Sequence, residues 1–164
     1  MKLLILGAGG YGQVAKEIAQ NSYSYIEFLD DNSELAIGKI SELEKFRDYK
    51  NAFIAIGNPK IRKELFDKCE SVGFSMISLI SDKAYISPRA MIDKGCIIEP
   101  MAVVNANSTI NKGTLVCAGA IINHNAVVND FCQIDCGAVV GAGCVVPSGT
   151  HLYYNDVEYK NNKV

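Results

Sequence analysis

His124 is one of only two histidines in this 164-residue chain, and a smaller residue would fit the repeating pattern around it. Imidazole titrates near neutral pH, so it can remove a proton from an attacking amine or hydroxyl and release it again. The next residue, Asn125, can orient the ring through its side-chain amide. These residue types suit general-base chemistry. The competing interpretation is a surface histidine without a catalytic role.

A second candidate site is the glycine-rich stretch GAGGYG at residues 7–12, where Gly7, Gly9 and Gly12 have GxGxxG spacing. Glycines let the backbone approach a pyrophosphate, and the N-terminus of a following helix favours its negative charge. Asp30 and Asp31 end the next apolar run, where a carboxylate can accept hydrogen bonds from ribose hydroxyls. These residues predict a nucleotide site. Turn glycines without a ligand are the alternative.

The first 79 residues alternate apolar runs with helical patterns, which predicts a small parallel sheet with crossover helices, about half the size of a Rossmann domain. We expect strands at residues 2–6, 25–31, 52–57 and 74–80 and helices at 12–20 and 61–72. The opening MKLLIL could begin a signal peptide, but the glycines break the apolar stretch, so a buried strand is the better interpretation.

From Ile80 a branched aliphatic residue recurs every six positions, and a small residue follows each one four positions later. The aliphatic positions are Ile80, Ile86, Ile92, Ile98, Val104, Ile110, Val116, Ile122, Val128, Ile134, Val140 and Val146. The small positions are Ala84, Ala90, Cys96, Ala102, Ser108, Thr114, Ala120, Ala126, Cys132, Ala138, Cys144 and Thr150. A period of six matches neither a plain strand nor a helix, and it predicts a solenoid of short strands and corners.

These hexads resemble those of the hexapeptide-repeat acyltransferases, whose left-handed parallel β-helix has three hexads, or 18 residues, per coil. Three asparagine pairs agree with that coil, because Asn105 and Asn123, Asn107 and Asn125, and Asn111 and Asn129 are each 18 residues apart. Stacked amides can hydrogen-bond along such columns. We expect about four coils at residues 80–151 and a tail at 152–164 that caps or leaves the solenoid.

The resemblance is to the branch that acetylates sialic acids and nucleotide-linked amino sugars with acetyl-CoA. It implies that His124 is the general base, Asn125 its orienting partner and the Ala142 N–H the donor to the thioester oxygen. The implied CoA-binding residues are Gln133, Gly141, Ala142 and Gly143. The implied nucleotide-sugar-binding residues are Gly9, Gly10, Tyr11, Gly12, Asp30, Asp31, Gly57 and Asn58. A homotrimer is implied as well.

The chain departs from relatives at three of these positions. Relatives often have an acid where Asn125 stands, a second histidine in place of Gln133, and histidine in place of Tyr11. They also usually have more coils. A nucleotide-sugar-binding protein with a shortened, non-catalytic solenoid is therefore the second hypothesis, and a dinucleotide-dependent enzyme is the third. The sugar, the nucleotide and the choice between N- and O-acetylation stay open.

Composition narrows the remaining classes. A net charge of −2 provides no excess of positive charge for binding nucleic acid. No apolar run is long enough to span a membrane. The six cysteines form no CxxC pair and in part occupy the small hexad slot, which favours reduced thiols in a cytoplasmic protein. His151 lies 27 residues from His124, so two histidines in that arrangement do not predict a zinc site.

Overall fold

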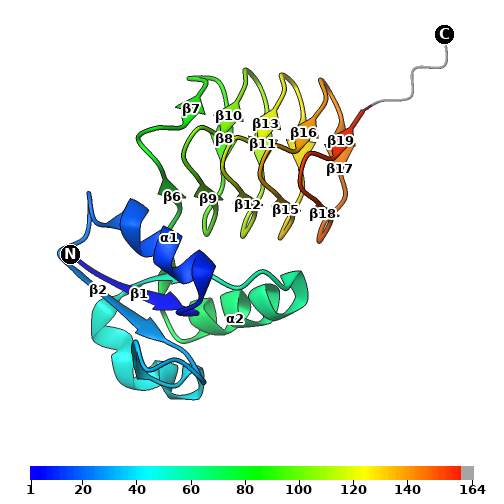
Figure 1. The fold of residues 1–164 in the computed structure, drawn as a ribbon. Helices are drawn as coiled ribbons and strands as arrows, with labels where there is room; N and C mark the ends of the chain where they lie inside the picture. The colour runs from blue at the N-terminus through cyan, green and yellow to red at the C-terminus, as the bar shows by residue number, and fades with distance from the viewer. Residues whose placement is uncertain (160–164) are drawn as a thin grey trace, which may run out of the picture. The chain divides into compact units, whose positions relative to one another are not determined.

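The computed structural model describes residues 1–159, which divide into two compact units (Figure 1). The first unit is Met1–Leu79, and the second contains the described residues from Ile80 onward. The division follows the change in sequence pattern, because a hexad that winds into a coil packs against its own neighbouring coils.

The N-terminal unit is a five-stranded parallel sheet with strand order β3-β2-β1-β4-β5. Its elements are β1 (Lys2–Leu6), α1 (Gly10–Ala19), β2 (Tyr25–Leu29), β3 (Ala36–Gly38), the 3-10 helix η1 (Ile40–Tyr49), β4 (Asn51–Ile54), α2 (Pro59–Ser71) and β5 (Ser75–Met76). Leu3, Leu4, Ile5 and Leu6 are fully buried, as expected for a central strand covered on both faces.

The alternating pattern predicted β1, β2, β4 and the two helices correctly, but β3 and η1 were missed. The segment that forms them is polar and lacks a clear period, so tertiary pairing of Ala36 with Phe28 decides its strand. The predicted strand at 74–80 is also wrong in extent. Only Ser75–Met76 joins the N-terminal sheet, and Leu79–Ile80 forms β6 of the solenoid.

In the glycine-rich loop at residues 7–12, Gly7 is required by its backbone conformation and Gly12 by the lack of space for a side chain. Gly7 has φ 103°, a left-handed conformation that side chains rarely adopt. A Cβ on Gly12 would lie 2.2 Å from the carbonyl oxygen of Gly7, so any side chain there would separate α1 from the end of β1. This part of the glycine motif is thus explained by close helix–strand packing.

The second unit is a parallel β-helix of two-residue strands. They are β6 (Leu79–Ile80), β7 (Tyr85–Ile86), β8 (Met91–Ile92), β9 (Ile97–Ile98), β10 (Val103–Val104), β11 (Thr109–Ile110), β12 (Leu115–Val116), β13 (Ile121–Ile122), β14 (Val127–Val128), β15 (Gln133–Ile134), β16 (Val139–Val140), β17 (Val145–Val146), β18 (His151–Leu152) and β19 (Val157–Glu158). Among the described residues they form three faces of five, four and five strands. Val104 pairs with Ile122 and Ile122 with Val140, which confirms the 18-residue coil.

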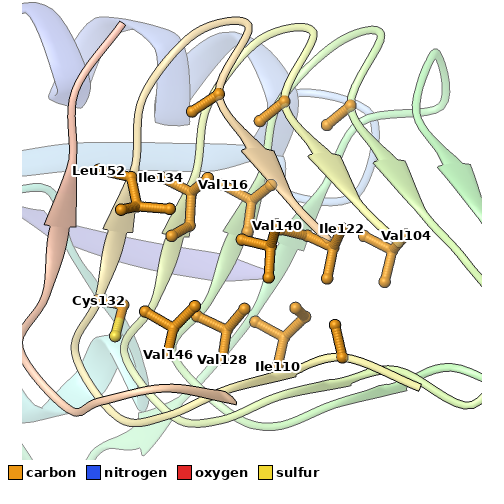
Figure 2. Packing of buried hydrophobic residues seen from close by; sticks show 14 of the residues in the cluster. Val104, Ile110, Val116, Ile122, Val128, Cys132, Ile134, Val140, Val146 and Leu152 are labelled. Atoms are coloured by element: carbon orange, nitrogen blue, oxygen red, sulfur yellow. The ribbon is translucent and has the colours of Figure 1, made fainter. Parts of the chain in front are cut away.

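The hexad aliphatics point into the prism and stack in three columns (Figure 2). One column contains Val104, Ile122 and Val140, each fully buried. Burying each such side chain contributes about 1.5–3 kcal/mol. Small residues such as Ala120 and Ala138 are also fully buried beside the corners, where a larger side chain would have no space.

The solenoid ends later than the sequence indicated. β18 and β19 continue the coil, with Val157 paired to Val139, so the predicted tail at 152–164 is structured at least to Glu158. The hexad pattern fails because Asp156 occupies a small-residue slot. That residue is exposed, and its carboxylate accepts a hydrogen bond from the Tyr153 N–H at 2.8 Å, which stabilises the last turn. Residues 160–164 of that tail lie outside the described chain.

Candidate functional site

His124 lies at the corner between β13 and β14, and its side chain is exposed. The side-chain nitrogen of Asn125 is 2.9 Å from ring Nδ1. Asn125 has φ 57°, a left-handed conformation that asparagine tolerates better than most residues. Within residues 1–159 no hydrogen bond reaches Nε2. The imidazole is thus held at one nitrogen and open to a ligand at the other.

Ala142 lies at the matching corner one coil later, in the loop between β16 and β17. Three neighbouring N–H groups of this loop are used by the fold: Gly141 donates to Glu158 at 2.7 Å, Gly143 to His124 at 3.0 Å and Cys144 to Gly141 at 3.1 Å. The N–H of Ala142 has no acceptor among the described residues, and the residue is exposed. It is a backbone donor available to a ligand.

The residue before Ala142 explains why this donor is free. At the corner one coil earlier, Asn123 Oδ1 accepts from the N–H of His124 at 2.8 Å. At another corner, Glu99 Oε2 accepts from the N–H of Ala118 at 3.0 Å. Gly141, which follows Asn123 in the same column, has no side chain to do this. A free N–H in a fixed loop can stabilise an oxyanion that develops during a reaction.

The structure separates Gln133 from this corner within one solenoid. Gln133 lies on β15, on a different face from β13, and is buried. Its amide donates to Asp135 Oδ1 at 2.7 Å, and Asp135 Oδ2 is 2.7 Å from Nε2 of His151. Of the predicted CoA-binding residues, only Gly141, Ala142 and Gly143 lie in the loop one coil after His124.

Two buried carboxylates were missed by the sequence analysis. Glu99 and Asp135 are 6% and 3% exposed and belong to one column, with Cys117 between them at 18-residue spacing. Burial raises the pKa of Glu99, the hydrogen bond from Ala118 opposes that rise, and the charge of Asp135 adds to it. The 18-residue spacing was the available signal, because it applies to polar residues as well as to the aliphatic columns.

The N-terminal unit contains a cavity of about 320 Å³ at the carboxyl ends of its strands. Its lining is Asp30, Asp31, Asn32, Ile40, Ile56, Ile61 and Leu65. Of the predicted substrate-binding residues it includes only the two aspartates. The four apolar residues were not foreseen, since they come from η1, α2 and the loop after β4. A pocket lined by both carboxylates and aliphatics suits a ribose with an attached planar base.

Asp30 is held in a fixed position at this cavity. Its Oδ2 accepts from the N–H of Ala8 at 2.8 Å, and its Oδ1 from the N–H of Asn32 at 2.9 Å. The hydrogen bond from Ala8, followed by that from Asn32, lowers the pKa of Asp30 below its ordinary value. The carboxylate therefore stays charged, and each oxygen keeps a lone pair for a further donor.

The other predicted binding residues have structural roles in the described chain. Gly9 is the N-cap of α1, and Gly10, Tyr11 and Gly12 form its first turn. The Asn58 side chain caps α2 by accepting from the N–H groups of Lys60 and Ile61. The carbonyl of Gly57 accepts from buried Arg62 at 2.7 Å. None of these six residues lines the cavity.

Known proteins resemble this chain in sequence and in fold. Residues 2–69 match the family model described as the PglD N-terminal domain. The acetyltransferase domain of PglB from Neisseria gonorrhoeae superposes with a TM-score of 0.87 at 29% identity, over 96% of this chain and 91% of that one. Its complex with acetyl coenzyme A gives a TM-score of 0.77 at 27% identity, over 92% and 94%. These matches support a hexapeptide-repeat sugar acetyltransferase.

A more distant match agrees in fold. A mutant of perosamine N-acetyltransferase from Caulobacter crescentus, in complex with CoA and GDP-perosamine, has a TM-score of 0.65 at 22% identity, over 92% of this chain and 90% of that one. These matches confirm the predicted fold class, a small Rossmann-like domain followed by a left-handed parallel β-helix. The chain has no group of three His, Cys, Asp or Glu side chains suited to a metal within residues 1–159. No helix in that range is long and apolar enough to cross a bilayer.

Proposed function

We propose that this protein transfers an acetyl group from acetyl-CoA to an amine or hydroxyl of a nucleotide-linked amino sugar or sialic-acid-like sugar, for surface polysaccharide or glycan synthesis in the cytoplasm. His124 is the general base and Asn125 its orienting partner. The observation that carries the proposal is the exposed imidazole with one nitrogen engaged and the other open, one coil from the free N–H of Ala142.

The reaction follows from these groups. The acceptor nitrogen or oxygen attacks the thioester carbonyl carbon while Nε2 of His124 takes the acceptor proton. Negative charge develops on the carbonyl oxygen, and the Ala142 N–H donates to it. When the tetrahedral intermediate collapses, the carbon–sulfur bond breaks and the CoA thiolate leaves. The imidazolium returns its proton to that thiolate, which restores the enzyme.

The cavity of the N-terminal unit is our proposed site for the nucleotide. Asp30 and Asp31 accept from ribose hydroxyls, and Ile40, Ile56, Ile61 and Leu65 cover the apolar parts of the ligand. The glycine loop then contributes by packing α1 against β1, since its glycines do not line the cavity. Gly57 and Asn58 do not line this cavity, and their contact with the ligand stays a prediction.

We also propose a homotrimer, with CoA bound between neighbouring solenoids. Outward-facing apolar side chains support it. On one face Tyr85, Ile121 and Val157 are 56%, 36% and 57% exposed, and on the next Met91 and Val145 are 64% and 60% exposed. Apolar columns of this kind are typical of protein interfaces. In such an assembly Gln133, on a face away from its own His124, would serve a neighbour's site.

The test is release of CoA thiol from acetyl-CoA in the presence of a panel of nucleotide-linked amino sugars, free amino sugars and sialic acids. Turnover with at least one acceptor is expected. Tight nucleotide-sugar binding in calorimetry, with no acetyl-CoA binding and no thiol release, would instead favour the non-catalytic binding protein. That alternative rested on a shortened solenoid. The chain covers 94% of a domain that binds acetyl coenzyme A, so its length no longer supports it.

A further inference from the structure

The side chains of Asn107, Asn125 and His124 form a hydrogen-bonded series at one corner of the solenoid. Asn107 Nδ2 donates to Asn125 Oδ1 at 3.3 Å, and Asn125 Nδ2 lies 2.9 Å from His124 Nδ1. Asn107 and Asn125 occupy the same corner of successive coils, with φ 59° and 57°. The left-handed backbone conformation alone does not explain why both positions are asparagine, because glycine occupies other left-handed corners, at Gly113, Gly119 and Gly137.

The direction in which these side chains donate hydrogen bonds fixes which nitrogen of the His124 ring holds the proton. An amide N–H pointing at Nδ1 requires a lone pair there, so a neutral ring then holds its proton on Nε2. A protonated Nε2 is no base toward a substrate at the open side of the ring. In the reverse direction Nδ1–H donates to Asn125 Oδ1, Asn125 Nδ2 donates to Asn107 Oδ1, and Nε2 has a free lone pair.

Only the reverse direction also suits the imidazolium that forms during transfer. Both ring nitrogens then hold a proton, and the one on Nδ1 needs an acceptor. An amide N–H in that place would face an N–H and oppose protonation. Each amide presents an oxygen and an NH₂ of similar size, so rotating both by half a turn keeps the same number of hydrogen bonds.

A second asparagine pair shows what decides direction elsewhere. Asn111 Nδ2 donates to Asn129 Oδ1 at 3.2 Å, and Asn129 Nδ2 donates to the carbonyl of Val146 at 2.9 Å. A backbone carbonyl can only accept, so that pair has one direction. The Asn107–Asn125 pair ends instead on an imidazole nitrogen, which can donate or accept. It is therefore the pair that can run both ways.

We propose that Asn107 and Asn125 act as a reversible amide relay, in which Asn107 is a positioning residue that sets the tautomer of His124. The relay rests on the proposed function of His124. When Asn107 donates to Asn125 and Asn125 donates to the ring, the resting enzyme is held with Nε2 of His124 protonated. Reversal of both hydrogen bonds produces the catalytic tautomer, with the proton on Nδ1. Asn107 itself does not touch the reacting atoms.

The test is Asn107→Asp, because aspartate tolerates the left-handed corner and its carboxylate can only accept. It forces the Asn125 NH₂ toward residue 107 and the Asn125 oxygen toward the ring. Asn125→Asp is the reference for a fully Nδ1-protonated ring. Asn105→Asp places the same charge at the same corner outside the relay, since Asn105 forms no side-chain bond to Asn125.

The readout is the two-bond 15N–1H spectrum of uniformly labelled protein without substrate, at a pH where the ring is neutral. The chain has two histidines, so a His151→Gln sample assigns the signals. We expect Asn107→Asp to move His124 from the Nε2-protonated toward the Nδ1-protonated form, as in Asn125→Asp, and Asn105→Asp to match the wild type. The kcat of Asn107→Asp should be at least that of the wild type and up to about 10-fold higher, with KM unchanged.

Equal tautomer populations in the wild type and Asn107→Asp would overturn the relay, as would an equal shift in Asn105→Asp. The tautomer is measured without turnover, so this failure is distinct from failure of the proposed function. A shift in the spectrum with no acetyl transfer by any form would keep the relay as a property of the corner and refute the role of His124 as base.

Discussion

The N–H of Gly143 donates to the carbonyl oxygen of His124 at 3.0 Å. This bond joins the proposed base to the loop of the next coil, in which Ala142 keeps a free N–H. The proposed base and the proposed oxyanion donor are thus positioned by the ladder that holds the coils together. Rigid elements of this kind hold catalytic groups more precisely than long loops do.

A hydrogen-bond acceptor in the side chain of residue 141 should occupy the N–H of Ala142, which is the proposed oxyanion donor. We predict that Gly141→Asn lowers kcat by about 10²-fold relative to Gly141→Leu, because its side-chain oxygen accepts from Ala142 as Asn123 accepts from His124. Leu has a similar shape without an acceptor. It also controls for the contact of any Cβ with the Glu158 carbonyl, at 3.0 Å. Equal steady-state rates in the two variants would remove Ala142 from the site.

Charge at the cavity of the N-terminal unit should control acceptor binding. Ile61 lines this cavity and is 45% exposed, so it can be replaced without disturbing the core. We predict that Ile61→Glu raises the acceptor KM by 10-fold or more through repulsion of the anionic nucleotide, which corresponds to about 1.4 kcal/mol or more. Ile61→Lys, which loses the same apolar surface, should raise it far less. Identical KM values would place the nucleotide elsewhere.

Glu99 should make stability depend on pH. Because burial raises its pKa above the ordinary 4.5, the folded state keeps a proton that the unfolded state has lost. The unfolding free energy therefore falls as pH rises from about 4.5 through the folded pKa. Glu99→Gln keeps an acceptor for the Ala118 N–H and should flatten that fall in urea titrations at several pH values. Exposed Glu64→Gln is the control, and an equal slope in both variants would contradict the assignment.

The repeat could be predicted from sequence because one physical rule applies at every coil. An inward position such as Ile122 accepts only an aliphatic side chain, and the corner beside it accepts only a small residue such as Ala120. The end of the solenoid was misjudged because Asp156 lies at an open edge, where the small-residue rule no longer holds. The segment that forms β3 and η1 was missed because its structure depends on tertiary contacts.

The candidate site was only partly predictable. His124 stood out by residue type, and the coil spacing placed Ala142 beside it. The cavity lining was not foreseen, since Ile40, Ile56 and Leu65 are separated in sequence and have no chemical signature. The packing of Gly12 against Gly7 accounts for one glycine of the GxGxxG pattern, and ligand contact by the rest of the loop stays a prediction.

The most direct measurement of the central claim is the kcat of His124→Ala with acetyl-CoA and an acceptor found in the thiol-release panel. The side chain is exposed, so the variant should keep the wild-type Tm and circular dichroism. Loss of the general base should lower kcat by about 10²–10⁴-fold. A folded His124→Ala protein that turns over at nearly the wild-type rate would contradict the account.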